Sequence, residues 1–279
     1  MPGDVLVGGR FRLREQLGRG SMAGVFRAVD LTGGRDVAVK IAADDSPKYR
    51  GRIANEAAIL AGLDHPSVVT FFAEGTMAGQ GELSGRPYIV EELALGPSLA
   101  EVGRGPRRSP AEVAAWAGGL FDGLSHLHER GVVHRDIKPA NLMLSGLRRS
   151  RVRIVDFGIA AAAGAPPEPG MSSGTVHYMS PEQASGGSAQ PCWDVYALGL
   201  VLLELLTGTR AYTGTAVESL VARTLRSPLV PAALGPGWVA LLRAVTAMDS
   251  AARPSAAEAA VMARRLAVGP QPVRLLHRR

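Results

Sequence analysis

The sequence contains very little cysteine: Cys192 is the single one among 279 residues. One thiol can form neither a disulfide within the chain nor a cysteine-based metal cluster, so both are excluded. The absence of a disulfide framework is typical of proteins from a reducing cytosol. Because Cys192 lies beside Trp193 in an apolar segment, we expect its side chain to be packed against other residues.

Long apolar runs are also missing. The most apolar segment, residues 195–206, contains Glu204 and is shorter than the roughly 20 residues of a membrane-spanning helix. Residues 1–9 have neither the basic start nor the apolar centre of a signal peptide. We therefore expect no membrane span in this chain and a cytoplasmic location.

Aromatic residues make up only 5% of the chain, and neither a helix-turn-helix nor an aromatic RNA-binding pattern is present. The formal net charge of +6 would suit a nucleic acid or an acidic membrane surface. Without a binding pattern, we attribute this charge to arginines spread over the exposed surface and expect no specific nucleic-acid partner. With 46% hydrophobic residues, the chain can form a sizeable core and does not have the composition of a disordered protein.

A dense group of polar residues is present between positions 134 and 158. Residues 134–141 read HRDIKPAN, and residues 156–158 read DFG after a short apolar run. Transfer of a phosphoryl group needs a carboxylate that positions the attacking hydroxyl, and oxygen ligands for Mg²⁺. Asp136 suits the first role, and Asn141 with Asp156 suits the second. Each tripeptide alone occurs by chance, but the ordered pair, with its aspartates 20 positions apart, is a specific signal.

A glycine-rich segment precedes this group. Residues 11–16 and 25–29 alternate apolar and polar side chains, as half-buried strands do. Residues 17–26 between them read LGRGSMAGVF. A glycine-rich turn between antiparallel strands lets backbone N–H groups approach phosphate oxygens. Alone this pattern is weak, because two glycines in a hairpin usually form only a turn.

A lysine interrupts the apolar run of residues 36–41, which is typical of a buried strand. Lys40 is either an edge residue that faces solvent or a buried cation, and a buried cation needs a partner. Glu56 follows 16 residues later and is a candidate partner, and the family resemblance described below implies that the two side chains form an ion pair.

Glu56 lies on a predicted helix. Ile53, Ala57 and Leu60 have the spacing of one apolar helix face. Ser46 and Pro47 favour a helix start, although Gly51 disfavours the helix in its first turn.

Together these segments resemble the eukaryotic-like Ser/Thr protein kinases of bacteria over residues 11–268. The resemblance implies an α+β, two-lobed protein-kinase-like fold, with a small antiparallel β lobe that carries one helix and a larger, mainly helical lobe. It implies a single catalytic domain over residues 1–268, followed by a basic tail over residues 269–279. Within the domain we expect the small lobe over about residues 10–94, the hinge over about 92–96 and the large lobe over about 97–268.

The resemblance also implies the site residues. Asp136 would orient the substrate hydroxyl, Lys138 would neutralise the transferred phosphate, and Asn141 and Asp156 would hold Mg²⁺, for which Mn²⁺ is a possible substitute. The implied catalytic set is Lys40, Glu56, Asp136, Lys138, Asn141 and Thr175. The implied nucleotide-binding set is Leu17, Gly18, Gly20, Val25, Ala38, Lys40, Glu92, Ala94, Met143 and Asp156.

Two residues depart from the family pattern. Ala23 stands where the third glycine of the glycine-rich loop is usual, and Gly24 falls one place late. Glu91 stands at the gatekeeper position, which relatives usually fill with an apolar side chain. A buried carboxylate there needs either a partner or a raised pKa.

Several segments of the predicted large lobe have structural signals. Residues 109–112 form a capping box before an apolar helix that ends at Gly131, and His126 and His128 on this helix lack a third partner for a metal. Residues 193–206 predict a fully buried helix, whose Asp194 resembles the aspartate that anchors the catalytic loop. Arg253 resembles the late arginine that pairs with Glu182. We expect residues 96–106 to be a plain crossing between the lobes and residues 160–170 to be flexible.

Residues 171–182 resemble the end of an activation segment. Thr175 would contact Asp136 and Lys138, and Lys138 with this threonine favours Ser/Thr over Tyr specificity. Ser172 and Ser173 are the hydroxyls just upstream, so we predict them as phosphorylation sites, although an unmodified polar turn is the alternative. Arg135 would then receive the phosphate.

The sequence thus predicts a Ser/Thr protein kinase that transfers the γ-phosphate of MgATP to protein substrates and phosphorylates its own activation segment. Such self-phosphorylation in trans would involve a homodimer. Two alternatives remain: a pseudokinase or scaffold that binds a nucleotide or partner without efficient transfer, and a small-molecule phosphotransferase of related fold. The latter typically lacks the segment that docks a polypeptide, which here spans residues 174–182.

Overall fold

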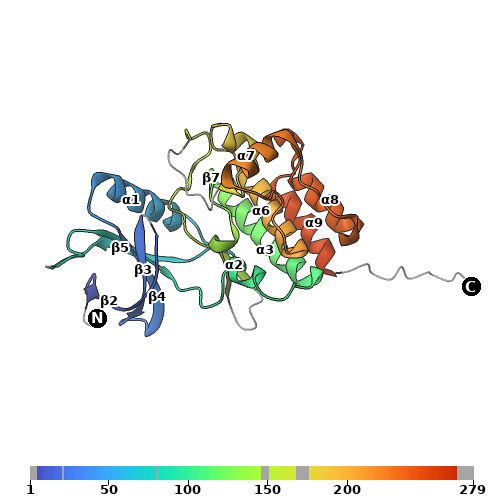
Figure 1. Cartoon of the computed structure of the whole chain (residues 1–279). Helices are drawn as coiled ribbons and strands as arrows, with labels where there is room; N and C mark the ends of the chain where they lie inside the picture. Colours follow the sequence, from blue (N-terminus) through green and yellow to red (C-terminus); the bar gives the residue numbers. More distant parts are fainter. Residues whose placement is uncertain (1–4, 21, 80, 146–150, 168–175, 269–279) are drawn as a thin grey trace, which may run out of the picture.

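The computed structural model of the chain describes residues 5–20, 22–79, 81–145, 151–167 and 176–268. Figure 1 shows two lobes side by side, with the β-sheet and helix α1 on one side and the long helices α3, α6, α8 and α9 on the other. The architecture predicted from the sequence, a small β lobe with one helix beside a larger helical lobe, is confirmed.

The smaller lobe is built on an antiparallel sheet with the strand order β1-β2-β3-β4-β6-β5. Its strands are β1 (Leu6–Val7), β2 (Phe11–Arg19), β3 (Ala23–Asp30), β4 (Arg35–Ala42), β5 (Phe71–Thr76) and β6 (Pro87–Glu92). The first two predicted strands are longer than expected, because Gly18 pairs with Val25 and Arg19 pairs with Gly24. Most of the glycine-rich segment is therefore paired strand, which side-chain alternation alone did not indicate.

The two faces of this sheet are buried against different partners. Val37, Val39 and Ile41 of β4 belong to a hydrophobic core on one face. Ala42, on the opposite face, packs with α1 (Pro47–Ala61). Because side chains alternate along a strand, Lys40 shares the face of Ala42 and points toward α1.

Helix α1 begins at Pro47 after Ser46, as predicted. Gly51, which made the first turn of this helix doubtful from the sequence, does not interrupt it, since the helix runs through this residue. A glycine in a helix costs about 1 kcal/mol relative to alanine. Burial of Ile53, Ala57 and Leu60 outweighs this cost.

The larger lobe is mainly helical, and α3 packs against both α6 and α9 at its centre. Its helices are α2 (Leu99–Gly103), α3 (Pro110–Glu129), α5 (Pro181–Ala184), α6 (Pro191–Thr207), α7 (Ala216–Leu225), α8 (Pro236–Val245) and α9 (Ala256–Val268). Short 3-10 helices are η1 (Pro139–Asn141), η3 (Ala232–Leu234) and η4 (Ser250–Ala252), and short strands are β7 (Val132–Val133), β8 (Leu142–Ser145), β9 (Arg151–Ile154) and β10 (Ala161–Ala162).

The predicted helix boundaries of this lobe agree with the structure at two places. Helix α3 begins after Ser109, whose side chain accepts a hydrogen bond from the Glu112 backbone in the predicted capping box. Helix α6 is almost entirely buried and is followed by Gly208, whose φ of 75° is in the left-handed region. Glycine adopts this conformation without the steric cost that a Cβ imposes, so it ends the helix.

Two segments expected to be irregular contain regular structure. Residues 96–106 include α2, which begins at a second capping box formed by Ser98 and Glu101. Residues 160–170 include β10, which pairs antiparallel with β7. The Ser98 capping box was a readable sequence signal, whereas the β10 pairing depends on a distant part of the chain.

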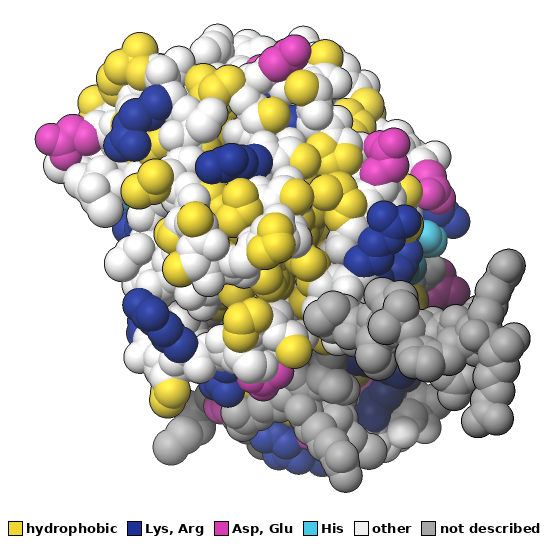
Figure 2. Space-filling model, turned by 90° about the vertical axis from the view of Figure 1, so that its right-hand side faces the viewer, with side chains coloured by type: hydrophobic (Ala, Val, Ile, Leu, Met, Phe, Trp, Pro, Cys, Tyr) yellow, Lys and Arg dark blue, Asp and Glu magenta, His cyan; other side chains and the backbone are white. Residues whose placement is uncertain are grey.

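Cys192 is half-buried and packs against the cluster of Val133, Ala189 and Trp193, so the predicted packing is confirmed in part. Within the described ranges, no helix is long and apolar enough to cross a membrane. Figure 2 shows the end of the larger lobe, where Lys and Arg side chains are scattered among hydrophobic and uncharged groups. On this face, the described residues carry positive charge without a continuous basic surface.

Two helical glycines are expected to respond oppositely to replacement by alanine. A Cβ on Gly199 of α6 would lie 2.6 Å from Val245 Cγ2 and 2.8 Å from Thr246 Cγ2, whereas a Cβ on Gly51 of α1 would meet nothing within 4 Å. We expect Gly199→Ala to lower the free energy of unfolding by about 1–2 kcal/mol through overpacking. We expect Gly51→Ala to raise it by about 0.5–1 kcal/mol. Urea unfolding of both variants tests this, and stabilisation by Gly199→Ala would contradict it.

Candidate active site

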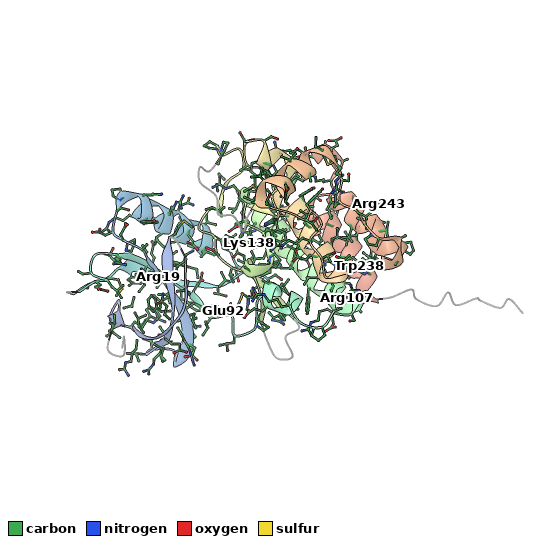
Figure 3. All side chains as sticks on the ribbon, in the orientation of Figure 1. Arg19, Glu92, Arg107, Lys138, Trp238 and Arg243 are labelled. Atoms are coloured by element: carbon green, nitrogen blue, oxygen red, sulfur yellow. The ribbon has the colours of Figure 1, made fainter. Side chains whose placement is uncertain are left out.

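A cavity of about 630 Å³ lies between the two lobes. All ten residues of the predicted nucleotide-binding set line it, and so do Asp136 and Lys138. Figure 3 shows Glu92 and Lys138, which come from opposite lobes, at this junction. The structure therefore gathers residues from distant parts of the chain around one space.

The cavity has an apolar part and a polar part. Val25 and Ala38 line the apolar part from the smaller lobe, and Met143 lines it from the larger lobe. Lys40 and Asp156 belong to the polar part. A cavity divided in this way suits a ligand that has a flat apolar ring at one end and a charged group at the other.

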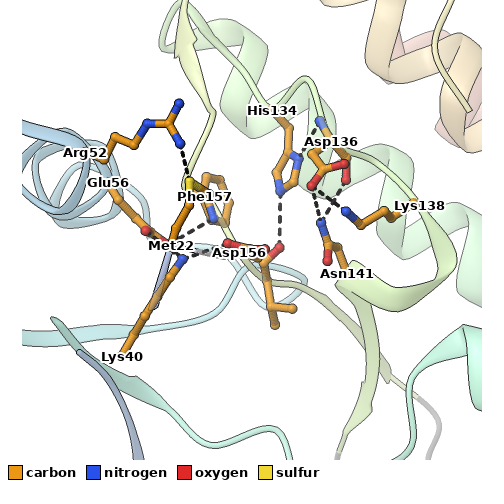
Figure 4. Close-up of polar contacts among 11 residues, drawn as sticks. Met22, Lys40, Arg52, Glu56, His134, Asp136, Lys138, Asn141, Asp156 and Phe157 are labelled. Carbon is orange, nitrogen blue, oxygen red and sulfur yellow. Dashed lines mark hydrogen bonds and ion pairs between the residues drawn. The ribbon is translucent and has the colours of Figure 1, made fainter. Parts of the chain in front are cut away.

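Lys40 joins three elements at the polar end. Its Nζ atom donates to Glu56 Oε1 and Oε2 of α1 at 2.9 and 2.8 Å, and to Asp156 Oδ1 at 2.7 Å (Figure 4). The ion pair with Glu56 that the sequence predicted is therefore present. Burial lowers the pKa of Lys40, but the carboxylates of Asp156 and Glu56 outweigh burial and raise it overall. The Lys40 ammonium in turn lowers the pKa of Asp156 to about 2, so this carboxylate is ionised at neutral pH.

The backbone after Asp156 is fixed by the same cluster. Asp156 has a φ of 64°, in the left-handed region, and follows the end of β9. The backbone N–H of Phe157 donates to Glu56 Oε1 at 3.1 Å. The Phe157 ring is fully buried and lies edge-on to His134, with 4.8 Å between the ring centroids. Glu56 thus holds both Lys40 and the residue that follows Asp156.

Asp136 is held by two neighbours in the loop before β8. Lys138 Nζ donates to Asp136 Oδ2 at 2.8 Å. Asn141 Nδ2 donates to the backbone oxygen of Asp136 and to its Oδ2, both at 3.0 Å. Because Nδ2 is used in this way, the amide oxygen of Asn141 is the atom that a cation could bind.

Asp194 anchors the start of this loop, as the sequence predicted. Its carboxylate accepts hydrogen bonds from the backbone N–H groups of His134 and Arg135, at 2.8 and 2.9 Å. Arg135 has a φ of 65°, in the left-handed region. His128 Nε2 lies 3.0 Å from Asp194 Oδ2, so this histidine supports the anchor and is not isolated on the surface.

The Arg135 guanidinium lies against the segment after Gly158. It donates to the backbone oxygen of Ile159 at 2.5 Å and to that of Pro166 at 3.2 Å. The predicted phosphorylation sites Ser172 and Ser173 and the predicted contact residue Thr175 lie outside the described residues. On the far side, Gln183 Nε2 of α5 donates to the Arg135 backbone oxygen at 3.0 Å. Arg135 therefore links the loop to both ends of this segment.

The pairing predicted for Arg253 is present. Its guanidinium donates to both carboxylate oxygens of Glu182, at 2.7 and 3.0 Å. This bidentate pair fixes α5 to the segment just before α9. A bidentate pair is the geometry in which an arginine binds a carboxylate most strongly.

Sequence reasoning missed several lining residues. Met22 and Arg52 line the cavity, and the Arg52 guanidinium donates to Met22 Sδ, which joins α1 to the glycine-rich segment (Figure 4). Arg52 lies four positions before Glu56, so the helical period could have placed it near the site. Ile159 and Val155 also line the cavity, and no sequence signal distinguishes them from ordinary core residues.

Glu91 resolves the alternative that the sequence left open. It is 9% exposed and lines the cavity, and its Oε2 atom is buried without a hydrogen-bond partner among the described residues. Burial raises the pKa of Glu91 to about 8. The carboxyl is therefore accommodated by a raised pKa.

We expect Glu91 to make the stability of the protein depend on pH. The pKa is about 8 in the folded protein and 4.5 for an ordinary glutamate, so the folded state holds a proton that the unfolded chain releases. The free energy of unfolding should fall as the pH rises from about 4.5 to about 8, and stay level above that. Each tenfold change in proton affinity corresponds to about 1.4 kcal/mol, so the total is several kcal/mol.

Thermal unfolding across this pH range measures the effect, with Glu91→Gln as the matched variant that cannot titrate. The stability of the parent relative to this variant should fall between about pH 5 and about pH 8. Parallel stability curves for the two proteins would contradict the expectation.

The protein kinase domain model matches residues 11–262 of the chain. A probable serine/threonine-protein kinase of Streptomyces coelicolor is 36% identical over 242 residues, which cover 82% of this chain and 35% of that protein. PknB of Mycobacterium tuberculosis is 37% identical over 258 residues, which cover 88% of this chain and 40% of PknB. PrkC of Bacillus subtilis is 36% identical over 229 residues, which cover 79% of this chain and 34% of PrkC.

The matched stretches thus cover between 34% and 40% of the length of these relatives. The residues that line the cavity, with Lys40, Asp136 and Asp156 among them, all lie within the residues that the protein kinase domain model matches. The match over residues 11–262 establishes that the chain belongs to the protein kinase domain family.

Proposed function

We propose that the chain is a serine/threonine protein kinase that transfers the γ-phosphate of MgATP to hydroxyl groups of protein substrates. One observation carries the proposal: Lys40, Asp136 and Asp156 line the same cavity, each held by a charged or amide partner. The intact polar set argues against a scaffold that has lost catalysis. The names of the relatives, all serine/threonine-protein kinases, support the same activity.

The apolar and polar parts of the cavity support the binding of ATP. The adenine ring would lie between Val25 and Ala38 on one side and Met143 on the other. Glu92 and Ala94 also line the cavity, and their backbone groups would meet the edge of the base. Lys40, raised in pKa by its carboxylates, stays cationic and would bind the phosphates.

Asp156 and Asn141 fit a magnesium ion. Mg²⁺ is usually held by one or two carboxylates together with substrate phosphates and water. Asp156 supplies an ionised carboxylate, and the Asn141 amide supplies an oxygen after its Nδ2 is used by Asp136. When bound, the ion would neutralise the charge of the phosphate oxygens.

Asp136 and Lys138 would act on the attacking hydroxyl. The Asp136 carboxylate would accept a hydrogen bond from the substrate hydroxyl and orient its oxygen toward the phosphate. Lys138, 2.8 Å from Asp136 Oδ2, would place its positive charge where the transferred group becomes most negative. The hydrogen bonds from Asn141 keep the carboxylate in one orientation.

Two finer points belong to the same proposal. The bidentate pair of Glu182 and Arg253 fixes the end of the segment that would dock a polypeptide, which favours a protein substrate over a small molecule. The single cysteine supports a location in the reducing cytoplasm.

We expect Asp136→Asn to lower kcat by about a hundredfold to ten-thousandfold, because the amide cannot take up the hydroxyl proton. ADP affinity should change by less than about threefold, since Asp136 acts mainly in the transition state. Transfer of labelled phosphate to casein measures kcat, and calorimetry with ADP measures affinity.

Asp122→Asn is the matched control, because Asp122 is a partly exposed carboxylate of α3 that pairs with Arg264 outside the cavity. This control should transfer phosphate at the parental rate. An Asp136→Asn protein that does the same would refute the role of Asp136.

We also expect incubation with MgATP to place phosphate on Ser172 or Ser173, because Arg135 lies against the segment that leads to them. Mass-spectrometric mapping of the parent and of Asp156→Asn gives the test. The Asp156→Asn protein should stay unmodified alone and become phosphorylated when mixed with the parent, as transfer between two copies requires. Modification of isolated Asp156→Asn at the parental rate would contradict the roles of Asp156 in this reaction.

A further inference from the structure

A buried cation lies on α7, outside the residues that line the cavity. Arg223 is 0% exposed and is one of the largest fully buried side chains. An arginine stays charged in proteins, so α7 carries a permanent positive charge inside the larger lobe. No step of the proposed phosphoryl transfer uses this charge.

Most partners of Arg223 belong to its own surroundings in the larger lobe and are uncharged. Its Nε donates to the backbone oxygen of Ser219 at 3.1 Å, and its Nη2 donates to Ser219 Oγ at 2.7 Å. Its guanidinium lies 5.4 Å from the centre of the Tyr212 ring. Among the described residues, Arg223 forms no ion pair with a carboxylate. A buried charge without a counter-charge is costly, so stability does not explain this arginine.

The remaining contact of Arg223 indicates a role. Its Nη1 donates to the backbone oxygen of Met179 at 2.7 Å. Met179 belongs to residues 176–182, the described part of the segment predicted to dock a polypeptide. A hydrogen bond from a charged donor is stronger than one between neutral groups. Arg223 therefore fixes the backbone of this segment to α7.

The segment that Arg223 holds borders the loop that carries Asp136. Ser180 follows Met179, and its Oγ accepts a hydrogen bond from the Gln183 N–H at 3.2 Å at the start of α5. Gln183 Nε2 donates to the backbone oxygen of Arg135 at 3.0 Å. Because Arg135 directly precedes Asp136, a polypeptide docked on this segment would lie beside the carboxylate that orients the substrate hydroxyl.

Two side-chain contacts hold the same segment on either side of Met179. Tyr178 Oη donates to Glu204 Oε2 of α6 at 2.6 Å. Glu182 forms the bidentate pair with Arg253. The Arg223 contact lies between these two, and it holds the backbone itself.

We propose that Arg223 is a positioning residue for the protein substrate, which holds the Met179 backbone and so shapes the surface on which the polypeptide docks. The inference rests on the proposed protein kinase activity and adds α7 to the parts of the chain that determine substrate binding. Because Arg223 is enclosed, it acts through Met179 and does not touch the substrate.

Steady-state transfer of phosphate from MgATP to casein by the full chain tests the proposal. Arg223→Met keeps an unbranched side chain but removes the charge and the donors. It should raise KM for casein by about tenfold, as expected for the loss of one hydrogen bond from a charged group. Its kcat and its KM for ATP should stay within about twofold of the parental values, because the cavity is unchanged. Arg223→Lys, which keeps a cation and N–H donors, should have a KM for casein closer to that of the parent.

Arg226→Met is the matched control. Arg226 is exposed directly after α7, and its guanidinium lies 5.7 Å from the centre of the same Tyr212 ring. This variant removes the same charge without altering the contact with Met179, so it should keep the parental KM for casein. An equal rise in KM for Arg226→Met and Arg223→Met would assign the effect to charge alone and overturn the proposal.

The outcomes separate this proposal from the proposed function. A parental KM for casein in Arg223→Met would overturn the role of Arg223 and leave the kinase proposal standing. A parallel rise in its KM for ATP would do the same, since it would indicate a general loosening of the larger lobe. Thermal unfolding checks that the variants are folded, and an unfolded Arg223→Met would show that Arg223 serves stability, which also overturns the proposal. Absence of transfer by the parent would overturn both proposals.

Discussion

The site depends on one buried cation, the Lys40 ammonium, and on the carboxylates that surround it. Its contacts with Glu56 and Asp156 join β4, α1 and the segment after β9 at a single atom. A buried charge is expensive unless it is paired, and the removal of one partner leaves the other uncompensated. The positions of α1 in the smaller lobe and of Asp156 in the larger lobe therefore both depend on Lys40. The position of the helix, the ionisation of Asp156 and the polarity of the cavity are consequences of one requirement.

In the larger lobe, the irregular loop that carries Asp136 is held in one conformation by its neighbours. Asp194, on a helix that is buried almost throughout, accepts the backbone N–H groups at the start of the loop. Asn141 and Lys138 then hold the Asp136 side chain. The start of the loop is thus anchored on a buried helix, and the Asp136 side chain is held by neighbours within the loop. The cavity lies between the Lys40 cluster and the loop that carries Asp136.

Much of this arrangement could be predicted because charged residues inside apolar segments have few solutions. Lys40 within a buried strand required a carboxylate, and Glu56 on one helix face supplied it. The lengths of β2 and β3, the strand β10 and the contact of Arg52 with Met22 could not be predicted in this way. They depend on pairing between backbone groups or between distant segments, which leaves no pattern in the side chains of either partner. Glu91 could be predicted in part. The sequence indicated a buried carboxylate, but the raised pKa depends on its burial and on nearby carboxylates that only the structure shows.

Arg135 and Asp156 are the two residues other than glycine with a left-handed backbone among those that the structure describes. A side chain in this conformation stores about 1–3 kcal/mol of backbone strain. Each strained residue lies next to a carboxylate that accepts a backbone hydrogen bond. Asp194 accepts from the N–H of Arg135, and Glu56 accepts from the N–H of the residue after Asp156. These two carboxylates therefore hold strained parts of the backbone in place. Loss of either carboxylate would therefore leave a strained peptide next to a functional aspartate without the hydrogen bond that holds it.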